Sequence, residues 1–143
     1  MKAAAGSGRR RAREVAFRLA YQADVMGEGL ETDAAAPAGE DDLGADQAEL
    51  VGDILRVLRG RAEEVDALVR AAARNWEMDR LAATDRSVLR IATAELIGRP
   101  GTPARVILDE AIEIARRYGS EASARFVNGV LDHVARALRP GEV

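Results

Sequence analysis

The sequence TPARVILDEAIEIARRYGSEASARFVNGVLDHVARAL occupies residues 102–138 and predicts two consecutive helices. Thr102 before Pro103 is a typical helix start, because a proline at the first helical position loses no hydrogen bond. Apolar residues then recur at helical spacing as far as Gly119, which we expect to end the first helix, and again from Ser120 to Pro140. These residues are Val106, Ile107, Ala111, Ile114 and Ala115, and then Ala124, Val127, Leu131, Val134 and Leu138.

The rest of the chain repeats this helical pattern. Apolar stripes with a period of 3.6 predict further helices over residues 9–26, 46–60, 62–72 and 84–98. An irregular turn is expected around Trp76, and no segment alternates apolar and polar residues as a half-exposed strand does. Aromatic residues make up only 3%, so the core must consist of alanine and aliphatic side chains. We predict an all-α bundle of six to seven helices that forms one domain over residues 1–143.

Charge is distributed unevenly along this chain, whose formal net charge is only −3. Lys2 and five arginines precede residue 24 with Glu14 as their only acid, and ten acids without a base follow over residues 24–53. We expect a mobile N-terminus over residues 1–8 and an acidic linker over about 28–44. Such polarity suits a nucleic-acid-binding protein, although a solvated basic tail and acidic loop would give the same pattern.

Candidate groups for catalysis or metal binding are few. The chain has no cysteine, and His133 is its only histidine, so a zinc or copper site would need carboxylates alone. No glycine-rich phosphate-binding motif occurs, and Asp132 beside His133 lacks the Gly-x-Ser-x-Gly motif of hydrolases. No apolar run approaches the ~20 residues of a membrane span. The sequence therefore predicts a cytoplasmic protein that is not an enzyme and has neither a metal site nor a cofactor.

A helical wheel of residues 9–26 places an aromatic pair opposite the apolar stripe. Phe17 and Tyr21 lie one turn apart, on the side of Arg10 and flanked by Arg13. Exposed rings beside guanidinium groups can stack on unpaired bases while the arginines bind phosphates. The same face could instead contact a partner protein, or pack against another helix of this fold.

Residues 116–132 contain a second group of aromatic and basic side chains. Tyr118 and Phe126 bracket the turn between the two C-terminal helices, with Arg125 beside them. Gly129 inside a helix costs about 1 kcal/mol relative to alanine, so we expect another helix to approach closely there. Asn128 could then form a hydrogen bond across that approach.

Several of these segments together resemble one known family. Residues 125–132, RFVNGVLD, are similar to the signature of the NusB family, and residues 9–14, RRRARE, resemble its arginine-rich N-terminal motif. Further similar segments are Asn75-Trp76, Arg80-Leu81, residues 85–92, Glu95-Leu96 and residues 107–115. The resemblance runs from about Arg9 to Ala137, interrupted by the acidic linker. It implies two packed helical subdomains and no enzymatic activity.

The resemblance also implies a function and partners. Members of the family bind the single-stranded boxA element of nascent ribosomal RNA transcripts together with the ribosomal protein NusE. This pair joins an RNA polymerase complex that contains NusA and NusG, and the complex suppresses premature termination.

Site residues follow from the resemblance position by position. Those that match the family's RNA contacts are Lys2, Arg9, Arg10, Arg13, Tyr118 and Arg125. Those that match its contacts with the ribosomal protein are Tyr21, Asp79 and Asp85. Acidic side chains that face a basic ribosomal protein are electrostatically complementary to it.

Two alternative functions stay open from the sequence. Some RNA methyltransferases contain a domain similar to NusB, and this reading would require a catalytic domain beyond Val143. The second alternative is a homodimeric helical interaction protein whose interface covers Phe17 and Tyr21.

Overall fold

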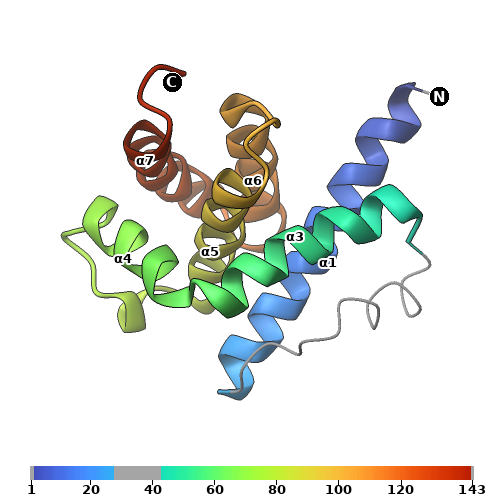
Figure 1. Ribbon diagram of the computed structural model, residues 1–143. Helices are drawn as coiled ribbons and strands as arrows, with labels where there is room; N and C mark the ends of the chain where they lie inside the picture. Colours follow the sequence, from blue (N-terminus) through green and yellow to red (C-terminus); the bar gives the residue numbers. More distant parts are fainter. Residues whose placement is uncertain (1, 28–42, 143) are drawn as a thin grey trace.

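The computed structural model of the chain describes residues 2–27 and 43–142, with side chains from Gly8 onward. This part of the chain consists of α-helices and one turn of 3-10 helix, without a strand (Figure 1). The elements are α1 (Lys2–Met26), α3 (Ala45–Gly60), α4 (Ala62–Ala72), η1 (Met78–Arg80), α5 (Ala83–Gly98), α6 (Ala104–Tyr118) and α7 (Glu121–Leu138). The prediction of an all-α bundle is confirmed.

Helix α5 is the centre of the bundle. It contacts α1 and α3 on one side and α6 and α7 on the other, and α4 packs against both α5 and α7 (Figure 1). Every residue from Ile91 to Leu96 is buried, because neighbours surround this part of the helix. This part of the helix has no face toward solvent, so its buried acid, Glu95, needs a partner inside the protein.

Aliphatic side chains fill the core, as the low aromatic content predicts. The largest apolar side chains that are fully buried are Leu50, Ile54, Leu89, Ile107, Leu108 and Leu131, and they come from α3, α5, α6 and α7. Burying one such side chain contributes about 1.5–3 kcal/mol. Alanines between them, such as Ala92 and Ala111, let the helices approach closely.

Helix ends agree with the sequence at some positions and differ at others. Ser120 caps α7, since its Oγ accepts a hydrogen bond from Ser123 N at 3.0 Å, and Gly119 follows α6 as expected. Helix α5 begins at Ala83, one residue before the predicted start at residue 84, and ends at Gly98 as predicted. The expected acidic linker lies outside the described residues apart from Leu43 and Gly44.

The first helix begins at Lys2, about two turns earlier than the predicted start at Arg9. One contact on this extension comes from α3, where Gln47 Nε2 donates a hydrogen bond to the carbonyl oxygen of Gly8 at 3.0 Å. Periodicity within the segment could not reveal this contact, because Gln47 belongs to another helix.

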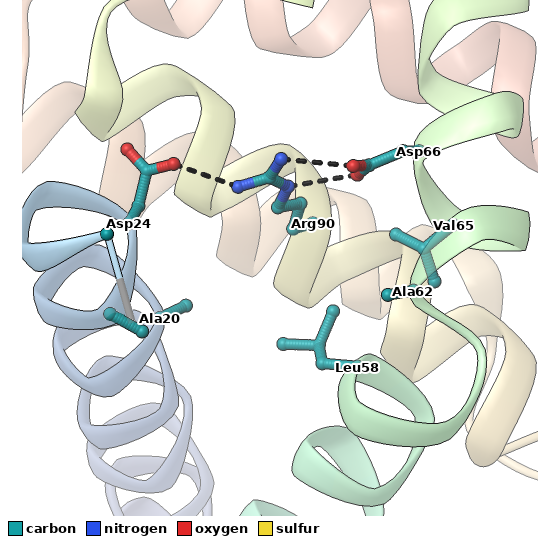
Figure 2. Close-up of a pocket in the computed structure, with 9 residues that line it drawn as sticks. Ala20, Asp24, Leu58, Ala62, Val65, Asp66 and Arg90 are labelled. Atoms are coloured by element: carbon teal, nitrogen blue, oxygen red, sulfur yellow. Dashed lines mark hydrogen bonds and ion pairs between the residues drawn. The ribbon is translucent and has the colours of Figure 1, made fainter. Parts of the chain in front are cut away.

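A network of ion pairs connects the C-terminal end of α1 to α5 and α4. Arg86 binds Asp24 through two hydrogen bonds of 3.0 and 2.7 Å, and Arg90 links Asp24 to Asp66 (Figure 2). The hydrogen bond from Arg86 and the charges of both arginines hold the pKa of Asp24 below its usual value, against the effect of burial. Arg86 Nη1 also donates to the carbonyl oxygens of Met78 and Leu81, so one guanidinium joins three segments.

Candidate nucleic-acid interface

The three arginines predicted on α1 occupy different environments. Arg9 and Arg10 are exposed, whereas Arg13 is only 4% exposed. The Arg13 guanidinium forms a bidentate pair with Glu95 of α5, with Nε–Oε1 and Nη2–Oε2 distances of 2.8 and 2.6 Å. The expectation that Arg13 contacts RNA is therefore corrected, because its donors face the interior and satisfy the buried acid. The side chain of Lys2 lies outside the described part of the structure.

Arg10 is exposed but is bound to a carboxylate. Its Nε and Nη2 donate to the two oxygens of Glu110 on α6 at 2.9 and 3.1 Å. This hydrogen bond, followed by the charge of Glu110, raises the pKa of Arg10. A second ion pair between the same helices joins Arg117 to Glu14. The charges of the basic motif are thus partly neutralised within the protein.

Aromatic rings of α1 and α6 form a cluster beside these ion pairs. The ring of Phe17 lies 4.9 Å from that of Tyr118 and 6.0 Å from that of Tyr21, measured between centroids. Phe17 is buried against Tyr118 of α6, so among the alternatives for this face of α1, packing against another helix holds for Phe17. Tyr21 and Tyr118 are 37% and 41% exposed. Phe17 therefore supports two tyrosines that remain available for contact with a ligand.

The structure also corrects the expectation for Gly129. A Cβ atom at this position would meet no other atom within 4 Å, so no helix approaches it closely. Asn128 is exposed and spans no helix contact. Gly129 instead lines an open groove of about 290 Å³ between α7 and the residues that follow α4.

Trp76 is the prominent side chain of this groove. It is 58% exposed and meets Phe126 edge to face, with ring centroids 5.7 Å apart. Arg74 and Arg125 line the same groove. Sequence reasoning named Arg125 but assigned no role to Trp76 or Arg74. The available signal was that a lone tryptophan lies in an irregular, polar stretch, where a structural core residue is not expected.

Ion pairing separates the arginines of the described chain into two groups. Most have a carboxylate or another partner, including those discussed above on α1 and α6. Within residues 8–27 and 43–142, the arginines without any such partner are Arg9, Arg70, Arg74, Arg80 and Arg125. Arg74 and Arg125 line the groove with Trp76, and Arg70 and Arg74 line a second groove on which Trp76 also lies. Arginines without an acid are the best available sites for phosphate groups, since no internal partner must be displaced.

The residues predicted to bind a partner protein lie near Arg86. Asp85 is the residue before Arg86 in α5. Asp79 follows Met78, whose carbonyl oxygen accepts a hydrogen bond from Arg86. Tyr21 lies one turn before Asp24, which is the ion-pair partner of Arg86. Asp79 is exposed, and Oδ1 of Asp85 is buried without a hydrogen-bond donor among the described residues. The contacts of Arg86 thus bring residues of α1, η1 and α5 to one region.

Two further kinds of site are absent from the described residues. No helix in them is long and apolar enough to cross a membrane. No three histidine, aspartate or glutamate side chains among them converge in the way that a metal ion requires.

A helical bundle whose surface presents arginines and aromatic rings belongs to the class of helical binding proteins. The chain is a member of the NusB family, whose family model matches residues 10–136. It is 40% identical over 131 residues to the transcription antitermination protein NusB of Koribacter versatilis (strain Ellin345), covering 91% of this chain and 90% of that protein. Proteins with this name have a regulatory and not a catalytic function, so the prediction of a non-enzymatic protein is confirmed.

Solved structures agree with this assignment. NusB from T. maritima superposes with a TM-score of 0.77 at 35% identity, covering 90% of each chain. A crystal structure of the antitermination factors NusB and NusE in complex with double-stranded RNA gives a TM-score of 0.77 at 25% identity, covering 92% of this chain and 98% of the other. These matches confirm the NusB-like fold.

Proposed function

We propose that this protein binds the boxA element of nascent transcripts as single-stranded RNA, together with the ribosomal protein NusE, and thereby acts in transcription antitermination. In this proposal it works in the cytoplasm, within an RNA polymerase complex that contains NusA and NusG. The observation that carries the proposal is the set of arginines that have no acid partner among the described residues, because several of them lie beside the exposed Trp76 and one of them is Arg9.

The RNA-binding surface in this proposal has two parts. The first consists of Arg9, Arg10 and Tyr118 on α1 and α6, and the second consists of Arg74, Arg125 and Trp76 around the groove. Exposed rings offer stacking surfaces to unpaired bases, and guanidinium groups bind the phosphates between them. The solved complex of a NusB with NusE and double-stranded RNA supports a role in RNA binding.

Tyr21, Asp79 and Asp85 form the proposed contact with NusE. Asp79 is exposed, and its carboxylate is complementary to a basic partner, whereas Oδ1 of Asp85 is buried. The network of Arg86 with Asp24 stabilises this region, because it joins the end of α1 to η1 and α5.

A titration of labelled single-stranded boxA RNA, with and without NusE, tests the proposal. We expect boxA RNA to bind more tightly than a scrambled sequence, and NusE to strengthen this binding. Asp85→Asn should weaken the effect of NusE and leave binding of RNA alone unchanged. Absence of RNA binding in the presence of NusE would refute the proposal. The homodimer alternative is tested by sedimentation, since RNA that competes with a dimer interface would dissociate the dimer.

A further inference from the structure

Gly129 lies in the interior of α7 and has no structural reason to be a glycine. Glycine is, after proline, the least favourable residue in a helix interior. Its two usual justifications are a left-handed backbone and the close approach of a neighbour. Neither applies, because Gly27 is the only described glycine with a positive φ, and a Cβ at Gly129 would meet nothing within 4 Å.

A side chain at position 129 would occupy the groove. Gly129 is exposed and lines the cavity of about 290 Å³ together with Trp76 and Phe126. Arg125 and Phe126 precede it by four and three residues, so their side chains lie next to position 129 on the surface of α7. A larger residue here would fill the space between α7 and Trp76.

The groove has the chemistry of a nucleobase site. Its apolar side is formed by the two rings, which meet edge to face at 5.7 Å and leave Trp76 58% exposed. Arg74 and Arg125 have no acid partner among the described residues, so their guanidinium groups can bind phosphates without breaking an ion pair. The volume of about 290 Å³ is just below the ~300–1,000 Å³ range of ligand pockets, which suits one ring system. None of the described residues that line this groove is acidic, so its two arginines favour an anionic ligand over a cationic one.

We propose that Gly129 keeps this groove open for one unpaired base of the bound RNA. The base lies against Trp76 and Phe126, and the adjacent phosphates bind Arg74 and Arg125. The absence of a side chain at Gly129 leaves room for the base in the groove, although glycine makes α7 less stable than alanine would. This inference rests on the proposed RNA-binding function and adds a specific place for one nucleotide.

The test compares Gly129 with a matched control glycine. Gly60 is the last residue of α3, is exposed, and has no atom within 4 Å of an added Cβ, and it does not line the groove, so it controls for a larger side chain on an open helix surface. Affinity for labelled single-stranded boxA RNA is measured by fluorescence anisotropy for Gly129→Leu, Gly129→Ala and Gly60→Leu. Thermal unfolding of the same full-length proteins is followed by circular dichroism.

We expect stability and RNA binding to change in opposite directions at position 129. Gly129→Ala should raise Tm by about 3 °C, since alanine favours the helix. Gly129→Leu should weaken RNA binding about tenfold, which is typical of the loss of one stacked base. Gly60→Leu should leave the RNA affinity unchanged. A purely structural role of Gly129 would instead lower Tm.

Trp76 provides a direct readout, because it is the only tryptophan of the chain. RNA should quench its fluorescence in the natural protein and in Gly60→Leu, and this quenching should be lost in Gly129→Leu. Normal RNA affinity and quenching in Gly129→Leu would overturn the inference while the proposed function stands. Loss of NusE binding with unchanged RNA binding would also overturn it, by assigning the groove to the protein partner. If the natural protein binds no RNA, both the proposed function and this inference are refuted.

Discussion

Arg13 of α1 and Glu95 of α5 form a bidentate ion pair inside the protein, where their side chains are 5% and 2% exposed. The pair joins the first helix to the central one. Each charge satisfies the other, so removing either leaves a buried charge without a partner. The arginine-rich motif of α1 therefore has two roles: some of its members face solvent, and Arg13 stabilises the fold.

Arg13→Ala should lower the free energy of unfolding by about 3–5 kcal/mol, because it leaves Glu95 buried and unpaired. Arg9→Ala, at an exposed position, should leave stability unchanged. Urea denaturation followed by circular dichroism measures both. The double variant Arg13→Met with Glu95→Leu removes both charges and should recover most of the stability. An Arg13→Ala protein of normal stability would contradict the structural role.

Salt dependence separates the arginines that have no acid partner in the described part of the chain from the others. For single-stranded RNA, each phosphate contact changes the slope of log affinity against log salt by about 0.7. Arg9→Ala and Arg125→Ala should each reduce the slope by about this amount. Arg105→Ala serves as the control, since Arg105 is exposed and paired with Asp109. Equal slopes for all four proteins would exclude Arg9 and Arg125 from the RNA contact.

The stability contribution of Asp24 should depend on pH. Because its hydrogen bond from Arg86 lowers its pKa in the folded state, the contribution is present above the unfolded pKa of about 3.9 and is lost as pH falls through the lower folded value. Asp24→Asn should destabilise the protein by about 2 kcal/mol at pH 7. The difference should shrink in acid, and urea denaturation at several pH values measures it. A difference that stays constant from pH 7 into the acid range would show that the carboxylate charge is not the cause.

Gly119, between α6 and α7, should tolerate no larger residue. A Cβ there would lie 2.8 Å from the carbonyl oxygen of Ala115 and 2.7 Å from Oγ of Ser123, both closer than real contacts allow. Gly119→Ala should therefore cost about 1–3 kcal/mol, measured by thermal or urea unfolding. Gly60→Ala, where space is open, should be neutral or slightly stabilising. Equal effects at the two positions would contradict the steric explanation.

Much of this protein could be predicted from its sequence alone. The all-α class, the two C-terminal helices with their turn at Gly119 and Ser120, and the family all follow from patterns within short segments. Periodicity and caps are local properties, since they depend on residues within one or two turns of each other. The resemblance to the family depended in the same way on the order of such segments, from residues 9–14 to 125–132.

Only the tertiary structure decided which side chains of these segments are available. On a helical wheel, Arg10 and Arg13 appear equally able to bind RNA. In the structure, Arg13 is buried against Glu95 of α5, whereas Arg10 is exposed and pairs with Glu110 of α6. In the same way Phe17 is buried by Tyr118, and Gly129 faces a groove formed with Trp76. Exposure and charge pairing arise between helices far apart in the chain, so a pattern within one helix contains no information about them.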